Sequence, residues 1–96
     1  MSDALNAAAD ALREKMGSSG FDGSIKFEMP GEGVIRIADG EVSTEDGDAD
    51  CTITAELETF QEMFEGELDP TAAYMTGKIK IDGDMGVAMK IGQVLA

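Results

Sequence analysis

The side chains that perform most acid–base and nucleophilic chemistry are scarce in this sequence. There is no histidine, so the commonest general base and metal ligand at neutral pH is missing. Cys51 is the single cysteine, and its place at the start of a strand-like segment predicts a small core or edge residue rather than a reactive thiol. Carboxylates are so common that any pair of them carries little information about hydrolysis. We therefore expect no catalytic residue and no enzymatic activity.

Two short motifs begin like ligand-binding loops and then depart from them. The segment 46–50, Asp-Gly-Asp-Ala-Asp, has the spacing that opens a calcium loop. Cys51 stands where the turn glycine of that loop belongs, however, and Leu57 stands where its bidentate glutamate belongs. The Gly-x-Gly at 31–33 is followed by Arg36 where a dinucleotide-binding loop needs a third glycine. We interpret these motifs as a solvated acidic loop and a turn, and expect neither a metal nor a cofactor.

Length and charge narrow the class of protein and of partner. The 96 residues, 43% of them hydrophobic, suit one folded domain spanning 1–96. The net charge of −13 disfavours nucleic acids and strong adhesion to anionic membranes. No apolar run approaches the ~20 residues of a membrane span, so stable membrane insertion is not expected. The N-terminus lacks a signal-peptide core and the end, 94–96, is not a peroxisomal tripeptide, which favours a cytoplasmic location.

Apolar periodicity predicts a chain that mixes helices and strands. Asp39-Gly40 between two alternating segments indicates a two-residue hairpin turn. Asp69-Pro70 fits a helix N-cap followed by a proline in the first helical position. The expected helices cover 2–16, 56–68, 70–76 and 84–95, and the expected strands cover 24–29, 33–38, 41–44, 51–55 and 78–81.

The C-terminal helix is the most unusual of these elements. Asp84 is a suitable N-cap, because its carboxylate can accept an unpaired backbone N–H of the first turn. After it, the only charged or amide side chains are Lys90 and Gln93. An ordinary surface helix buries one apolar stripe and exposes polar residues elsewhere. One apolar face of this helix can pack on a sheet, so the other should meet a lipid, a membrane or a partner.

The stretch around this helix also carries a family resemblance. Residues 74–90, YMTGKIKIDGDMGVAMK, resemble the closing motif of the sterol-carrier-protein-2 (SCP2) lipid-binding domain, roughly GK(L/I)K(I/V)xGxMGxAMK after a short aromatic-containing helix. The rest of the chain matches in the order and spacing of its elements. The resemblance implies an α+β fold, with a five-stranded, mostly antiparallel sheet, helices packed on one face and an apolar cavity between them. It also implies non-enzymatic binding and transfer of a hydrophobic lipid such as a fatty acid, a fatty acyl-CoA or a sterol-like molecule.

The candidate lipid contacts are apolar side chains of the C-terminal half. Methionine is flexible and polarizable, so it adapts to guests of variable shape, although each methionine alone is also compatible with ordinary core packing. The expected contacts are Phe60, Phe64, Met75, Ile81, Met85, Met89 and Ile91. For an anionic head group, the nearest cations in this part of the chain are Lys78, Lys80 and Lys90.

A second function remains open at this stage. The apolar C-terminal helix could form a protein interface, either in a homodimer or with a lipid-modifying enzyme to which the domain presents its lipid. A molecular mass in solution that rises with protein concentration, without lipid uptake, would indicate the homodimer. Turnover of a lipid substrate that occurs only when a partner enzyme is present would indicate the lipid-presenting role.

Overall fold

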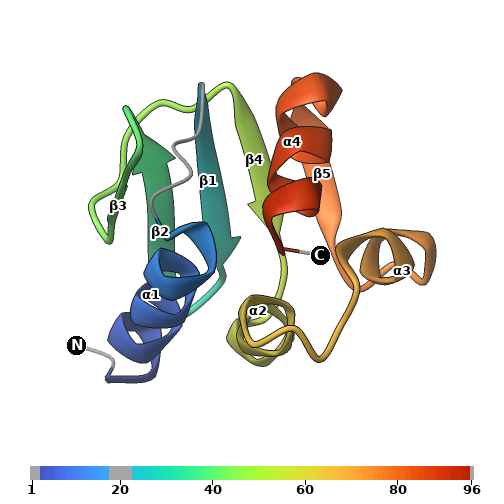
Figure 1. The fold of residues 1–96 in the computed structure, drawn as a ribbon, viewed down its shortest axis with the longest axis horizontal. Coiled ribbons are helices and arrows are strands. Elements are labelled where there is room, and N and C mark those ends of the chain that lie inside the picture. Colours follow the sequence, from blue (N-terminus) through green and yellow to red (C-terminus); the bar gives the residue numbers. More distant parts are fainter. Residues whose placement is uncertain (1–2, 18–22, 96) are drawn as a thin grey trace.

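A computed structural model describes residues 3–17 and 23–95 of the chain. Helices and strands follow one another in the expected order (Figure 1). The elements are α1 (Asp3–Met16), β1 (Ser24–Met29), β2 (Gly33–Ala38), β3 (Glu41–Ser43), β4 (Cys51–Thr54), α2 (Leu57–Phe64), α3 (Pro70–Met75), β5 (Lys80–Gly83) and α4 (Met85–Leu95).

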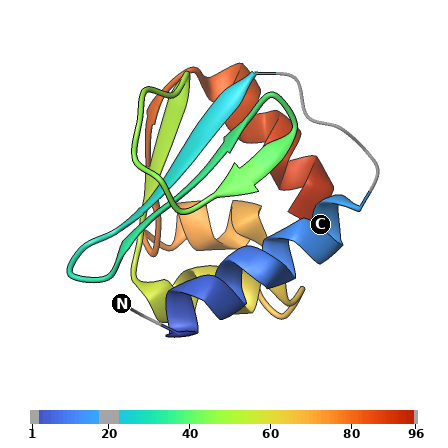
Figure 2. The same cartoon turned by 90° about the vertical axis from the view of Figure 1, so that its left-hand side faces the viewer.

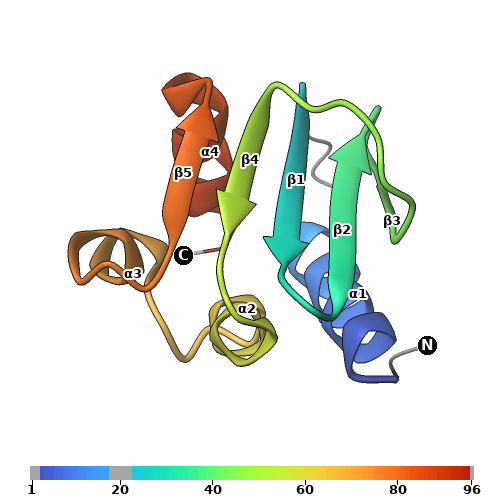
Figure 3. The same cartoon turned by 180° about the vertical axis from the view of Figure 1, so that it is seen from behind.

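The five strands form one sheet in the order β3-β2-β1-β4-β5. The pairs β1–β2, β2–β3 and β4–β5 are antiparallel, whereas β1 and β4 run parallel. The sheet seen from behind in Figure 3 therefore has a parallel pair at its centre. The expectation of a five-stranded, mostly antiparallel sheet is confirmed.

The two hairpin turns follow from residues that adopt a positive φ. Asp39 and Gly40 have φ of 55° and 78°, and they join Ala38 directly to its partner Glu41. Two consecutive positive φ values identify a type I′ turn, whose twist matches that of the strands it joins. After β1, Gly31 has φ of 83° and the Glu32 N–H donates to the Met29 carbonyl at 2.9 Å. The predicted hairpin turn at 39–40 and the turn at 30–31 are both present.

The helices lie on one side of the sheet, and the core fills the space between (Figure 2). Alternation along β1 directs Ile25, Phe27 and Met29 inward, where all three are fully buried. Phe27 meets two rings of α2, Phe60 and Phe64, in edge-to-face contacts with centroids 5.2 Å apart. The two α2 rings stack on each other at 5.7 Å. This three-ring cluster fixes α2 against the sheet.

Two elements differ from the predicted bounds by two residues or more, because α2 is shorter than predicted and β5 is shifted along the chain. Helix α2 ends at Phe64 instead of residue 68, because Gly66 adopts a φ of 82°. The Glu67 N–H then donates to the Glu62 carbonyl at 2.8 Å and the Gly66 N–H to the Met63 carbonyl at 3.2 Å, which is a Schellman termination. Strand β5 begins at Lys80 rather than residue 78. Its pairing with β4 starts there, opposite Thr54.

The acidic segment 44–50 crosses from β3 to β4 and is fastened to the outer face of the sheet. Lys26 Nζ lies 2.9 Å from Asp46 Oδ1, and Arg36 Nε donates to the Asp48 carbonyl at 2.8 Å. The Lys26 ammonium, through this hydrogen bond, lowers the pKa of the Asp46 carboxyl. The expected acidic loop is therefore a tethered crossover connection.

Candidate functional site

Helix α4 packs one side on the core and leaves the other bare, as its composition suggests. Asp84 caps it, since Oδ1 accepts the Gly86 N–H at 2.8 Å and, more weakly, the Val87 N–H at 3.4 Å. Its core side consists of Val87, Ala88, Ile91 and Leu95, all buried. By contrast, Met85 is 47% exposed and Met89 is 67% exposed. The fold thus does not cover the whole apolar surface of α4.

A cavity of about 410 Å³ opens beside this helix. Its walls come from helices α3 and α4, from the edge strand β5 and its neighbour β4, and from Met63 of α2. Ile53 of β4 and Ile81 of β5 are cross-strand partners, so both point inward from the sheet. The volume lies within the range of small-molecule pockets, about 300–1,000 Å³. The complete lining is Ile53, Met63, Asp69, Pro70, Thr71, Tyr74, Ile79, Ile81, Met85, Ala88, Met89, Ile91, Gly92, Gln93 and Leu95.

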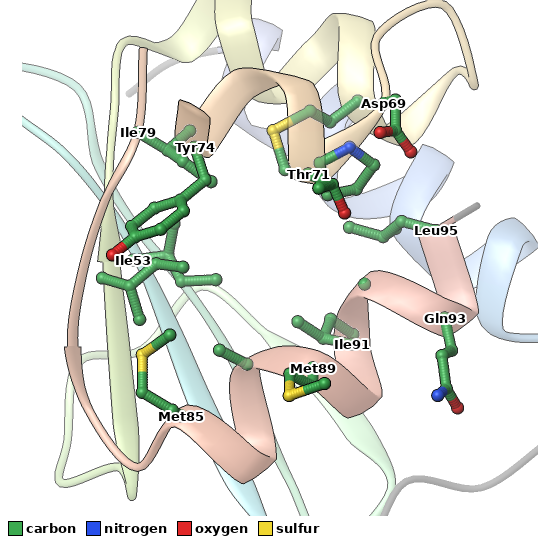
Figure 4. Close-up of a pocket in the computed structure, with 15 residues that line it drawn as sticks. Ile53, Asp69, Thr71, Tyr74, Ile79, Met85, Met89, Ile91, Gln93 and Leu95 are labelled. Carbon is green, nitrogen blue, oxygen red and sulfur yellow. The ribbon is translucent and has the colours of Figure 1, made fainter. Parts of the chain in front are cut away.

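The cavity is apolar on its strand side and more polar on the opposite side (Figure 4). Ile53 and Ile79 lie beside Tyr74 on the strand side. Asp69 and Gln93 lie across from them, where the start of α3 approaches the end of α4. A ligand that is apolar for most of its length and polar at one end fits this distribution.

Four of the seven expected lipid contacts line this cavity. These are Ile81, Met85, Met89 and Ile91. Met85 and Met89 are four residues apart and share one face of α4, whereas Ile91 reaches the cavity from the buried side of the helix. In Figure 4, Met85 points across the cavity toward Ile53, and Ile91 points into it from the helix. Their contact with a ligand remains a prediction.

The other three expected contacts lie elsewhere. Phe60 and Phe64 are buried in the ring cluster on Phe27 and are not part of the cavity wall. Met75 is 80% exposed and also lies outside the wall. It follows Tyr74 by one position, a rotation of about 100° around α3, which turns it away from the cavity. The structure thus places all three away from a ligand held in this space.

The three lysines are exposed and do not line the cavity either. Lys80 alternates with the inward-facing Ile81, so its side chain stands on the opposite face of β5. Lys78 belongs to the connection between α3 and β5, and Lys90 lies on the exposed surface of α4. The expected head-group site is therefore not assembled at this cavity.

Sequence reasoning missed the wall contributed by α3. Pro70, Thr71 and Tyr74 face the cavity, with spacings of one and three residues that match one side of a short helix. That periodic signal was available, but over six residues it is weak. The inward position of Ile53 opposite Ile81 required the strand pairing, which the sequence pattern does not specify.

The side chains with nucleophilic or metal-binding potential are placed without a functional arrangement. Burial raises the pKa of the Cys51 thiol, and the Asp84 and Asp82 carboxylates raise it further, which opposes thiolate formation. Within residues 3–17 and 23–95, no three His, Cys, Asp or Glu side chains are grouped to hold a metal ion. Across the same ranges, no helix is both long and apolar enough to cross a bilayer.

The fold and the cavity together define a small α+β domain that holds a mostly apolar, open cavity between its sheet and its helices. The chain belongs to the SCP-2 sterol transfer family, whose model matches residues 5–96. The sequence resemblance drawn from the C-terminal motif is thereby confirmed over nearly the whole chain.

Similar curated proteins are much longer than this chain. A hydroxysteroid dehydrogenase-like protein 2 from Xenopus tropicalis is 42% identical over 59 residues, which is 62% of this chain and 13% of that protein. The Danio rerio protein of that name is 38% identical over 82 residues, 77% of this chain and 20% of that protein. Sterol carrier protein 2 of Homo sapiens is 39% identical over 61 residues, 60% of this chain and 11% of that protein. The chain thus spans at most a fifth of these relatives.

Solved structures share the fold. The sterol carrier protein domain 2 of Helicoverpa armigera is 27% identical with a TM-score of 0.75, over 96% of this chain and 85% of that one. Sterol carrier protein 2 of Aedes aegypti, solved with palmitate, gives a TM-score of 0.78 at 17% identity over 100% of this chain and 97% of that one. At that identity the likeness concerns the fold alone.

Proposed function

We propose that this domain binds the hydrocarbon part of a lipid in the cavity between α3, α4 and the β4–β5 strands, and carries it without a covalent step. The observation that supports this most directly is the cavity itself, a space of about 410 Å³ with a mostly apolar wall. Water finds few hydrogen-bond partners in such a space, whereas each ligand CH₂ that is buried there contributes about 0.8 kcal/mol to the free energy of binding. The palmitate complex of the Aedes aegypti relative lends support from the same fold.

Among the candidate ligands, the fatty acid, the fatty acyl-CoA and the sterol-like molecule share this hydrocarbon requirement. The bound lipid would contact Ile81, Met85, Met89 and Ile91, and beside them the α3 residue Tyr74. Because Met85 and Met89 are exposed at the edge of the cavity, they are suited to admit and release a guest. The domain would then act as a non-enzymatic lipid carrier in the cytoplasm.

Tyr74 makes the proposal easy to test. It is the single tyrosine, the chain has no tryptophan, and it lines the cavity. Its fluorescence should therefore change when straight-chain alcohols from octanol to dodecanol are titrated into the protein. If hydrocarbon burial drives binding, affinity should rise about fourfold with each added methylene. Absence of binding, or an affinity that is independent of chain length, would refute the proposal.

The exposed methionines support a second candidate, a protein-interaction module. Met75 is 80% exposed and lies outside the cavity, so a lipid in that space would not cover it. Either another copy of the chain or a lipid-modifying enzyme could cover it instead. Sedimentation over a hundredfold range of concentration, with Met75→Gln as the matched variant, tests self-association. A monomer at every concentration would exclude the homodimer.

A further inference from the structure

The cavity has one charged side chain on its wall, and that side chain is acidic. Asp69, Thr71, Tyr74 and Gln93 supply its polar atoms, and the remaining wall is apolar. Of these four, Asp69 alone is charged. Asp69 and Thr71 lie beside each other at the start of α3, and Gln93 lies on the other side of Leu95 near the end of α4, across from the strands (Figure 4). A ligand with its hydrocarbon against the strands has its polar end near this group.

Asp69 is held in place as part of the fold. It is the N-cap of α3, and its Oδ2 accepts the Ala72 N–H at 3.1 Å. The residue is exposed, so the carboxylate is solvated while it also faces the cavity. Because the cap fixes this side chain, its negative charge cannot easily turn away from a bound head group.

None of the seven Lys and Arg residues of the chain, Lys15 included, lines the cavity. Arg13 pairs with Asp10, while Lys26 and Arg36 hold the acidic crossover segment. The lysines of the C-terminal segment, 78, 80 and 90, do not reach the cavity wall. A fatty-acid anion would therefore meet repulsion at this end of the cavity and no compensating positive charge.

Uncharged hydrogen-bonding groups are available at the same place. In the described part of the chain, the Thr71 hydroxyl and the Gln93 amide have no hydrogen-bond partner. Within the same residues the Tyr74 hydroxyl is also unpaired, but it lies on the strand side of the cavity. A hydroxyl offers both a donor and an acceptor, and the amide offers two donors and an acceptor. These groups match an alcohol, ester or amide at the end of a lipid.

We propose that this cavity selects lipids with an uncharged polar end, a hydroxyl or an ester, and that Asp69 is the residue that disfavours anionic lipids. This inference rests on the proposed lipid-binding function and specifies its ligand class. Thr71 and Gln93 hydrogen-bond the polar end, while the hydrocarbon lies toward Ile53 and Ile81. A single exposed charge at about 4 Å changes the affinity for an anion by roughly fivefold, and less in high salt.

The experiment compares dodecanol with dodecanoate, which carry the same hydrocarbon, in low salt and at neutral pH. Asp69→Asn removes the charge and keeps the cap, because asparagine caps a helix as well as aspartate does. Asp82→Asn is the matched control, since it removes the same charge from an exposed residue outside the cavity wall. Binding is followed by Tyr74 fluorescence and verified by native mass spectrometry.

We expect Asp69→Asn to raise the affinity for dodecanoate about fivefold and to leave that for dodecanol within twofold. Asp82→Asn should change neither affinity by more than twofold. Gln93→Lys, which adds a cation at the same end, should also strengthen dodecanoate binding by about fivefold or more. All three effects should shrink when the salt concentration is raised.

The possible failures are distinguishable. If dodecanol does not bind, the proposed lipid-binding function fails. If dodecanol binds but dodecanoate responds equally to Asp69→Asn and Asp82→Asn, the function stands and the role of Asp69 is overturned. The selectivity is also overturned if Lys90→Gln weakens dodecanoate binding, because the carboxylate would then be held by the lysine.

Discussion

Gly92 offers a way to fill the proposed ligand space without damaging the fold. It lies in the interior of α4 and on the cavity wall. A Cβ atom built at this position meets no atom within 4 Å apart from its chain neighbours and the nearby backbone of its own helix, and the backbone has no positive φ that would strain a side chain. Gly92→Leu should therefore direct four carbon atoms toward empty space. Gly92→Ala is the matched variant that changes the backbone propensity and little else.

The two substitutions should affect stability and binding in opposite directions. Replacing a glycine inside a helix by alanine or leucine gains about 0.8–1 kcal/mol of helix propensity. In a domain of this size, that raises Tm by about 4–8 °C. If the leucine side chain displaces three methylenes of a bound lipid, the loss is about 2.4 kcal/mol, or roughly 50-fold in affinity. Gly92→Ala should lose no more than about fourfold, the equivalent of one methylene.

Thermal unfolding and dodecanol titration on the same protein samples provide the assay. Ala72→Leu is a further control, because Ala72 is an exposed helical residue of α3 outside the cavity wall. The reasoning is refuted if Gly92→Leu is at least as stable as the parent protein and binds dodecanol equally well. In that case the lipid would occupy another place.

Three further predictions concern the support of the site. Asp84→Ala should cost about 1 kcal/mol in urea unfolding, because α4 loses its N-cap, whereas Asp84→Asn should restore most of that loss. Phe60→Ala should cost about 3–5 kcal/mol, since its ring is fully buried between Phe27 and Phe64; a cost below 1 kcal/mol would contradict the packed ring cluster. The pKa of Asp46 is lowered by its hydrogen bond from the lysine ammonium, so the ionised form favours the folded state; Asp46→Asn should be less stable than the parent at neutral pH, and the difference should disappear in acid below that lowered pKa. Equal stability of these two proteins at every pH would contradict that assignment.

Most of the secondary structure could be predicted from the sequence because local signals determine it. The turn at Asp39-Gly40, the cap at Asp69 and the cap at Asp84 all depend on residues next to one another in the chain. The predicted end of α2 lies four residues beyond the observed one, because the left-handed conformation of Gly66 ends the helix at Phe64. The parallel pairing of β1 with β4 joins segments separated by a long crossover, and local periodicity does not specify such a pairing.

Residues of the candidate site could be predicted where the pattern of a single helix places them. They could not be predicted where their position depends on how two elements pack together. The apolar surface of α4 alone predicted Met85, Met89 and Ile91 as lipid contacts, and all three line the cavity. Phe60 also belongs to an apolar helix face, but that face packs against Phe27 of β1. Its ring therefore lies in the core and not on the cavity wall. A sequence pattern identifies which side of an element is apolar, and only the packing decides whether that side meets protein or empty space.

All residues on the cavity wall come from positions 53–95, and none comes from α1 or the first three strands. The two halves of the chain are thus subject to different demands. Under the proposed function, substitutions in the N-terminal half must preserve a scaffold, while those in the C-terminal half would alter which lipid is bound. Variation among homologues that differ in cargo should therefore concentrate in α3, β5 and α4, and an engineer who wishes to retune the carrier can leave the first fifty residues unchanged.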